Sequence, residues 1–246
     1  VTITVAARTI ESAVAAPTGG QNLTHTEVHA LPVNRTPFGI ASLAPGLTTN
    51  APNAGQLVIS GSFGYDNVYL LDGVDISDNL FGSSNSLYVE DAIEETQVLT
   101  STIPAEYGRF SGGVVNAVTK SGGDAFTGGY RLNVTNDAWQ LKTPFEERSS
   151  ATRRNHLNFA HEGTMGGPIR KASLWFFGAM RYSKAKNLVT LPFTGLPFEV
   201  NAENTRAELK LTGNVAQHHA VTLGYMTNDR RDQTLAFGER SVGPDL

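Results

Sequence analysis

Carboxylates are the side chains of this sequence whose spacing comes nearest to a metal site. Asp72, Asp75 and Asp78 recur at every third position and are followed by Asn79. Such a stretch could hold a calcium ion, but loops of the EF-hand type place their acidic ligands at alternate positions. Asp and Asn are also common turn and capping residues. We therefore expect turn roles here and no metal.

The histidines are not placed to share a metal ion either. His218 and His219 are adjacent, and adjacent residues of a strand point to opposite faces. His156 and His161 are five positions apart, which again puts them on opposite faces of a strand. We expect these four side chains to be solvated or to lie at an interface.

No pattern of an enzyme is present. Glu94 and Glu95 are neighbours in an expected strand and therefore face apart, which disfavours acid–base pairing. The sequence has no cysteine, and it lacks the nucleophile elbow, the phosphate-binding loop, the dinucleotide fingerprint and the zinc-protease helix. We expect neither catalysis nor a cofactor.

The composition fits an ordered protein built from strands and turns. Of the 246 residues, 40% are hydrophobic and 17% are charged, with 25 glycines and 11 prolines. The net charge of −4 argues against nucleic-acid binding. No stretch approaches the roughly 18 consecutive apolar residues of a membrane helix, a test that membrane-spanning strands escape. The chain begins at Val1 without a methionine and ends in a polar stretch, so we expect a fragment of a longer protein.

The first half of the chain predicts a compact α+β domain. Short helices are expected after Thr24 or Thr26, ended by Pro32, and after Thr36, which precedes a proline. Short strands are expected at residues 1–5, 57–60, 68–71, 94–99 and 114–118, and a linker at residues 9–21.

The second half predicts antiparallel strands of about 9–11 residues, the length that crosses a bilayer when tilted. The clearest of them alternates Ala207, Leu209 and Leu211 with polar residues. Five such segments follow Thr127, and their connections alternate between long (136–154 and 185–203) and short (165–172 and 214–217). Outer-membrane barrels show this alternation, with the long loops extracellular. From pattern alone a soluble β-sandwich is the alternative.

Six motifs occur in an order that resembles the plug domain of TonB-dependent outer-membrane receptors, in particular their Oar-like subgroup. They are EVHALPVN at 27–34 leading into LAPGL, VYLLDGVD at 68–75, AIEETQVL at 92–99, AEYGR at 105–109, GGVVNAVTK at 112–120 and MGGPI at 165–169. The resemblance implies an α+β plug domain followed by antiparallel all-β strands of a truncated transmembrane β-barrel. The implied domains are residues 1–123, a TonB box and plug, and residues 124–246, the N-terminal part of the barrel with about five strands.

The resemblance also implies a function. It is energised uptake of an external ligand, such as a siderophore, carbohydrate, peptide or other nutrient, through a plugged barrel in the cell outer membrane, with a periplasmic N-terminus. The implied partners are the TonB energy-coupling protein, outer-membrane lipid and an unknown small ligand, and no nucleic acid. The TonB box would comprise Val1, Thr2, Ile3, Thr4, Val5, Ala6 and Ala7. The expected ligand-binding residues of the plug loops are Phe63, Tyr65, Asp78, Asn79, Phe81 and Asn85.

Two other functions stay open at this point. One is a surface adhesion or matrix-export protein on the same scaffold, because a fold does not fix a function. The other is a soluble periplasmic β-sandwich binding protein. The sequence also departs from the family at Ser60 and Gly61, where many receptors carry Arg before Gly, so a plug–barrel ion pair is not expected at that position.

Overall fold

The computed structural model describes residues 19–31, 36–49, 56–78, 82–85, 87–108, 110–139, 141–148, 155–190, 197–216 and 219–232. These residues form two compact units. Unit 1 is drawn from Val1–Ser86 and Ala92–Lys120, and unit 2 from Leu87–Asp91 and Ser121–Leu246. The chain therefore enters unit 2 briefly at Leu87–Asp91, returns to unit 1 and leaves it after Lys120.

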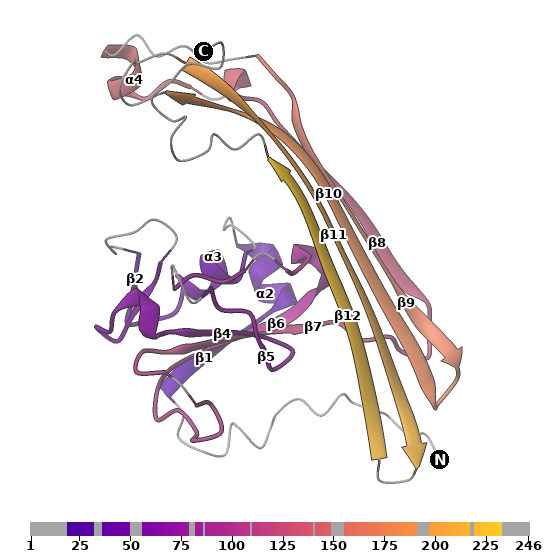
Figure 1. The fold of residues 1–246 in the computed structure, drawn as a ribbon. Helices are drawn as coiled ribbons and strands as arrows, with labels where there is room; N and C mark the ends of the chain where they lie inside the picture. The colour runs from indigo at the N-terminus through magenta and orange to yellow at the C-terminus, as the bar shows by residue number, and fades with distance from the viewer. Residues whose placement is uncertain are drawn as a thin grey trace. The chain divides into compact units, whose positions relative to one another are not determined.

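Unit 1 is built on a five-stranded sheet in the order β1-β6-β7-β4-β5 (Figure 1). The strands β4 and β7 run parallel and the other neighbours run antiparallel. A two-stranded ribbon, β2-β3, accompanies the sheet. The bounds are β1 (Gly19–Thr24), β2 (Leu47–Thr48), β3 (Val58–Ile59), β4 (Val68–Leu71), β5 (Val74–Asp75), β6 (Ile93–Ser101) and β7 (Val114–Thr119).

Two short helices begin where the sequence predicts them. The first, α2 (His25–Ala30), is capped by Thr24: the Thr24 hydroxyl accepts from the Glu27 N–H, and the Glu27 carboxylate accepts from the Thr24 N–H at 2.8 Å. The second, α3 (Pro37–Ala41), is capped by Thr36, whose hydroxyl accepts from the Gly39 N–H at 3.1 Å. Two 3₁₀ turns, η1 (Gly64–Asp66) and η2 (Glu90–Ala92), follow.

The core of unit 1 joins the sheet to the helices. Val68, Leu70 and Val114 form one buried cluster from the central strands β4 and β7. Leu23, Val28 and Ile40 form a second, which packs the apolar faces of α2 and α3 together with β1. Helices and strands thus pack together in unit 1, in agreement with the α+β domain predicted for this half of the chain.

The acidic stretch of unit 1 has the turn roles that its sequence predicts. Asp72 adopts a left-handed backbone with φ of 50°, and its carboxylate accepts from the Thr119 N–H at 2.9 Å and the Thr119 hydroxyl at 2.5 Å. The Asp75 carboxylate accepts from the Ser77 N–H at 2.8 Å. In the part of the chain that the structure describes, no group of three His, Cys, Asp or Glu residues is arranged to hold a metal ion.

Unit 2 is a second five-stranded sheet in which each strand pairs antiparallel with the next along the chain (Figure 1). Its strands are β8 (Thr127–Thr135), β9 (Asn158–Arg170), β10 (Leu174–Thr190), β11 (Pro197–Ala216) and β12 (His219–Asp232). A 3₁₀ turn, η3 (Asp137–Trp139), and a helix, α4 (Pro144–Arg148), follow β8. No helix among the described residues is long and apolar enough to cross a membrane.

Four expectations about element bounds are wrong. The long connection expected at residues 185–203 is mostly strand, because β10 runs to Thr190 and β11 begins at Pro197. The strands β9 to β12 have 13, 17, 20 and 14 residues rather than about 9–11. In β10 and β11, the ion pairs Lys184–Glu203 and Lys186–Glu199 extend the ladder beyond the apolar segment. The turn expected at 165–172 is mostly strand, since β9 runs to Arg170. The linker expected at 9–21 gives way to β1 at Gly19, and residues 1–18 lie outside the described part.

The two faces of the unit 2 sheet differ in the way that the alternation predicts. Residues that pair across strands share a face, and one such row joins Tyr130, Gly163, Met180 and Ala207. This face is apolar and exposed, with Tyr130, Leu132, Val134, Met165, Met180, Leu209, Leu223 and Tyr225. The other face is buried and mixed, with Ala160, Glu162, Trp175, Phe177, Ala179, Glu208 and Lys210. His161 lies on the exposed face and shares a hydrogen bond of 2.6 Å with the Tyr130 hydroxyl.

Candidate functional site

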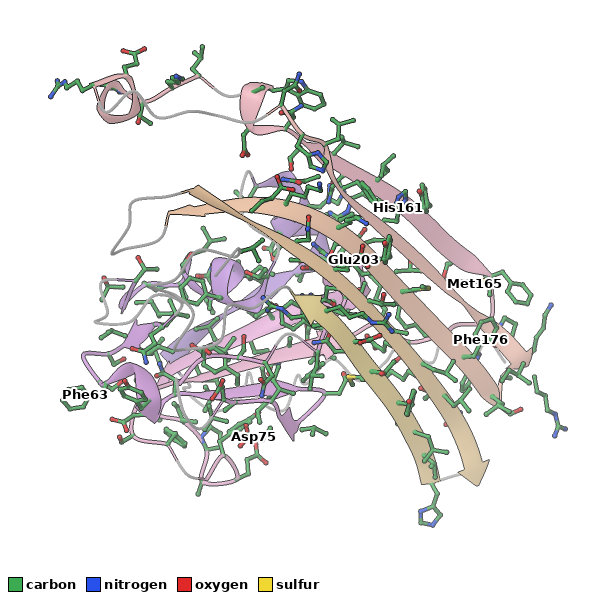
Figure 2. The ribbon with its side chains drawn as sticks, turned by 45° about the horizontal axis from the view of Figure 1, so that its top comes forward. Phe63, Asp75, His161, Met165, Phe176 and Glu203 are labelled. Atoms are coloured by element: carbon green, nitrogen blue, oxygen red, sulfur yellow. The ribbon has the colours of Figure 1, made fainter. Side chains whose placement is uncertain are left out.

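Two exposed aromatic rings of unit 1 flank the first residue of η1. Phe63 is 75% exposed and Tyr65 is 54% exposed, whereas Gly64 between them is buried. A Cβ at Gly64 would lie 2.9 Å from the Cβ of Gln56, so the backbone packs closely there and leaves no room for a side chain. Figure 2 shows the ring of Phe63 projecting from unit 1.

A second segment, which includes Asp78, Gly82 and Ser83, lies against the backbone of Gly64 and Tyr65. The Asp78 N–H donates to the Ser83 carbonyl at 2.7 Å, and the Gly82 N–H donates to the Asp78 carbonyl at 2.8 Å. Gly82 has φ of 60°, and a Cβ there would lie 2.7 Å from the Cα of Tyr65. Four of the predicted ligand residues therefore lie on two segments whose backbones meet at Gly82 and Tyr65: Phe63 and Tyr65 on one, and Asp78 and Asn85 on the other. The other two, Asn79 and Phe81, lie outside the described residues.

Backbone N–H groups of the segment ahead of β7, which contains Gly112 and Gly113, hydrogen-bond to Asp66 and Asn67 at the end of η1. Both the Ser111 and the Gly112 N–H groups donate to the Asp66 carbonyl, at 3.2 and 3.0 Å. Asn67 is buried, donates from its amide to the Leu57 carbonyl at 2.6 Å and accepts from the Gly113 N–H at 3.0 Å. Sequence reasoning did not single out Asn67, although an Asn just ahead of a buried strand is a recognisable capping position.

Unit 2 contains a row of charged side chains that sequence reasoning also missed. Arg131, Glu162, Arg181 and Arg206 are direct cross-strand partners on β8 to β11. The Glu162 side chain is fully buried and accepts from Arg131 Nη2 at 2.6 Å and from Arg181 Nη1 at 2.5 Å. These side chains meet because of the pairing register of the strands: if a strand slipped by one residue, its side chain would point to the opposite face of the sheet.

The segment Leu87–Asp91 supplies the remaining charges of this row. Asp91 pairs with Arg131 Nε at 3.0 Å, and its N–H donates to Glu162 at 3.3 Å. Glu90 pairs with Arg181 and, at 3.5 Å, with Arg206.

Tyr88 completes the attachment of this segment. The Arg206 guanidinium lies 5.6 Å from the centre of the Tyr88 ring and donates to the Tyr88 carbonyl at 3.1 Å. Three carboxylates and three guanidiniums therefore balance in a half-buried cluster, which we call the arginine row, and its contacts hold Leu87–Asp91 on the sheet.

The start of the unit 2 sheet is fastened by a single carboxylate. Asp124 Oδ1 accepts from the Ala172 N–H at 2.9 Å and from Trp175 Nε1 at 2.7 Å. These two hydrogen bonds hold the pKa of Asp124 below its usual range. The segment ahead of β8 is thereby attached to the turn between β9 and β10.

The apolar face of unit 2 is hollowed where its strands carry glycine. A groove of about 420 Å³ runs over Gly163 and Gly178 and is rimmed by Met165, Phe176 and Met180. Figure 2 labels Met165 on β9 and Phe176 on β10. A Cβ at Gly163 would meet nothing within 4 Å, so the backbone does not require glycine at this position. The groove exists because no side chain fills it there.

The predicted TonB-box residues 1–7 lie outside the described residues. Their role and the roles of the loop residues in unit 1 therefore stay predictions. The described residues offer polar and aromatic contacts on the loops, a charged cluster on the strands and an apolar sheet face.

Comparisons with known proteins place these features in context. No family model matches the chain. The chain is 33% identical over 235 residues to the TonB-dependent transporter Oar of Myxococcus xanthus, a match that covers 83% of this chain and 22% of that protein. The chain thus spans about a fifth of the length of this relative.

Solved structures share the fold. The siderophore receptor PirA from Acinetobacter baumannii superposes with a TM-score of 0.68 at 18% identity, over 87% of this chain and 32% of that one. The outer membrane transporter YddB from Escherichia coli gives a TM-score of 0.60 at 19% identity, over 86% and 33%. At such identities the likeness concerns the fold alone. It confirms the predicted fold class, an α+β plug followed by antiparallel strands.

Proposed function

This chain belongs to the TonB-dependent outer-membrane receptors, where its motifs resemble the Oar-like subgroup, and on that premise we propose that it takes part in the energised uptake of an external ligand. Unit 1 would act as the plug domain and unit 2 as the first strands of the barrel. The domain bounds proposed for these roles are residues 1–123 and 124–246. Its place is the outer membrane, as for its relatives.

The two-faced sheet of unit 2 is the observation that carries this proposal. Membrane barrels expose apolar side chains to lipid and keep polar ones inside, in strict alternation. Here Tyr130, Leu132 and Val134 are exposed on one face of β8, while Arg131 between them points to the buried arginine row. An apolar exposed face would be an aggregation hazard in water, and it fits a hydrocarbon surrounding.

The proposed ligand contacts lie on unit 1. Phe63 and Tyr65 present aromatic rings, and the adjoining segment contributes Asp78 and Asn85. Asn79 and Phe81 belong to the same proposed set. A few polar groups beside aromatic surface are the usual composition of a small-molecule site. We expect binding of an external ligand at these loops.

The proposed contact with TonB is the segment of residues 1–7. It is rich in β-branched residues, so in an extended form it can add as a strand to the sheet edge of a partner. Such pairing depends on backbone N–H groups. We expect the substitution Ile3→Pro in the full-length protein to abolish uptake, because proline removes one of these donors.

Ligand uptake by cells producing the variant provides the measurement, with the amount of receptor in the outer membrane held equal. Ser12→Pro, outside the predicted box, is the matched control and should leave uptake unchanged. Equal loss in both variants would argue against a box at residues 1–7.

Fractionation and surface proteolysis of the full-length parent protein test the location and the topology. We expect recovery in the outer membrane and cleavage within residues 136–154 on intact cells. Recovery as a soluble protein would overturn the barrel. Cleavage of intact cells at the turn after β9, with residues 136–154 protected, would invert the topology. Uptake that survives loss of the receptor, together with lost surface adhesion, would instead favour the adhesion function.

A further inference from the structure

The exposed face of the unit 2 sheet changes from apolar to charged along a line that crosses the strands obliquely. On this face, residues that pair directly across neighbouring strands form rows that run from β8 to β12. One row has no charged residue and consists of Gly128, Met165, Gly178, Leu209 and Tyr225. The row two residues further along β10 consists of Tyr130, Gly163, Met180, Ala207 and Thr227. A polar residue thus enters at the β12 end of this second row.

The polar residues advance by one strand with each further row. The third row consists of Leu132, His161, Tyr182, Thr205 and Asp229, and it is polar on β11 and β12. The fourth row consists of Val134, Phe159, Lys184, Glu203 and Arg231, and it is charged on β10, β11 and β12. The apolar surface therefore ends at Tyr182 on β10, at Ala207 on β11 and at Tyr225 on β12, whereas β8 is still apolar at Val134. Figure 2 labels one residue on each side of this boundary, His161 and Glu203.

The slope of this boundary is that of a flat surface crossing tilted strands. A step of one strand, about 4.8 Å, accompanies two residues along a strand, about 7 Å, so the line makes an angle of roughly 55° with the rows. Strands of membrane barrels tilt by about 35–45°. The observed steps are coarser, because only every second residue points to this face. The edge of a docked protein would follow the outline of that protein instead.

The aromatic side chains next to the boundary have polar atoms. The Tyr130 hydroxyl shares a hydrogen bond of 2.6 Å with Nδ1 of His161. Tyr182 and Tyr225 are the last aromatic residues of this face on their strands before the charged ones. Rings that are apolar with one polar atom are enriched where a membrane meets water.

Beyond the boundary the charged side chains are exposed and paired with one another. Lys184 lies 2.5 Å from Glu203, and Arg231 lies 3.1 Å from Asp229. Charges this exposed require water, because an ion in hydrocarbon is strongly unfavourable. Strand β10 runs on to Thr190 and β11 begins at Pro197, so both continue beyond these pairs for roughly 20 Å.

We propose that the surface of the lipid bilayer crosses unit 2 along this oblique line. Lipid hydrocarbon then covers β8 as far as Val134 but β12 only as far as Tyr225, and the ends of β10 and β11 beyond Tyr182 and Ala207 stand in water. The proposal rests on the barrel role proposed for unit 2 and adds to it the position and the slope of the membrane boundary.

The experiment uses the full-length receptor in outer membranes, with a nitroxide spin label on one introduced cysteine at a time. The label is tested for its accessibility to oxygen, which concentrates in hydrocarbon, and to a water-soluble nickel chelate. Leu132→Cys and Asp229→Cys form a matched pair, because the two positions lie at opposite ends of one row. We expect oxygen to be favoured at Leu132→Cys and the chelate at Asp229→Cys. The ratio of the two accessibilities should differ by about tenfold or more, because moving polar groups into hydrocarbon costs more than the roughly 1.4 kcal/mol that tenfold represents.

A second pair on one strand, Met180→Cys and Lys184→Cys, should show the same contrast. Equal ratios at Leu132→Cys and Asp229→Cys would overturn the oblique line, and equal ratios at Met180→Cys and Lys184→Cys would overturn its position on β10. Protection of all four labels from both reagents would mean that protein rather than lipid covers this face, which would also overturn the proposal. Preference for the nickel chelate at all four positions would contradict the barrel role of unit 2 itself.

Discussion

Gly113 lies at a point of unit 1 where the chain has no room for a side chain. A Cβ there would lie 2.5 Å from Ile59 Cγ2 and 2.8 Å from the Leu99 carbonyl oxygen. The same close packing brings its N–H to Asn67. Gly108, a few residues earlier, has nothing within 4 Å of such a Cβ.

We expect Gly113→Ala to destabilise unit 1 by about 1–3 kcal/mol, the usual range for overpacking of a filled core. Gly108→Ala is the matched control and should have little effect. The measurement is the denaturant midpoint of the purified full-length protein, followed by protease resistance of unit 1. A midpoint that falls equally in both variants would contradict the packing argument.

Glu162 is the residue on which the arginine row depends. Its buried carboxylate accepts from two guanidiniums, Arg131 and Arg181. We expect Glu162→Gln to cost about 3–5 kcal/mol, because removing one partner leaves buried charge uncompensated. Unfolding temperature in detergent, read from heat-dependent gel mobility, provides the measurement.

Glu203 offers a matched control for this change. It also accepts from a cation at 2.5 Å, Lys184, but both side chains are 39% exposed. Because exposed pairs contribute about 0–1 kcal/mol, Glu203→Gln should change the unfolding temperature little. If both variants lost the same stability, burial would not be what makes the arginine row important.

At the scale of elements, α2 carries a pH-sensitive cap. Hydrogen bonds from the Thr24 N–H and hydroxyl to the Glu27 carboxylate hold the pKa of Glu27 below its usual value. A group whose pKa is lowered by folding stabilises the fold above its unfolded pKa of about 4.3 and loses that contribution as the pH falls through the folded pKa.

We therefore expect faster hydrogen exchange in α2 as the pH falls below about 4, after correction for intrinsic exchange rates. Thr24→Ala should reduce this extra pH dependence without abolishing it, because it deletes the hydroxyl of the cap and keeps the backbone N–H that also donates to Glu27. The helix α3 should keep its protection in both proteins. An unchanged pH profile in the variant would show that Glu27 is held by other groups.

The sequence correctly predicted the helix starts and the turn that depend on interactions between neighbouring residues. Thr24 and Thr36 precede their helices as capping residues, and the turn at Asp72 carries an Asp-Gly pair with left-handed backbones. The strand β1 was not predicted, because its sequence GGQNLT has no hydrophobic alternation and it is a strand only through its pairing with β6. The low strand propensity of these residues is overcome by their pairing with β6, about 75 residues further along the chain.

Long-range register accounts for what the sequence did not reveal in unit 2. The alternation correctly separated the apolar from the polar face of the strands. The polar half, however, gave no sign that Arg131, Glu162 and Arg181 would face one another, since that depends on which residues pair across three strands. The strand lengths were underestimated for a related reason: the ion pairs that extend β10 and β11 exist only once those strands are paired.

At the scale of the whole molecule, the apolar face of unit 2 predicts which positions a reagent dissolved in the bilayer can label and which positions a water-soluble reagent can label. The chain has no cysteine, so single cysteines can be introduced by substitution. We expect Leu209→Cys, on the exposed face of β11, to react with a maleimide dissolved in the bilayer and not with a water-soluble one. Ala138→Cys in η3 should show the opposite preference, because it belongs to the loop predicted to be extracellular.

Labelling of the full-length receptor in intact outer membranes gives both results from one preparation, with the unsubstituted protein as the background. Efficient aqueous labelling at Leu209→Cys would mean that this face is not in contact with hydrocarbon.

The position of β1 at the edge of the unit 1 sheet has a mechanical consequence. It is the first described element of the chain and is joined to β6 by six cross-strand residue pairs, whereas β4 and β7 lie side by side inside the sheet. Tension applied ahead of Gly19 would load β1 before any other strand. An edge strand peeled from its end breaks its hydrogen bonds one after another, while interior strands loaded along their length must break theirs together. Little work would therefore detach β1, and unit 1 would yield to a pull in steps rather than all at once.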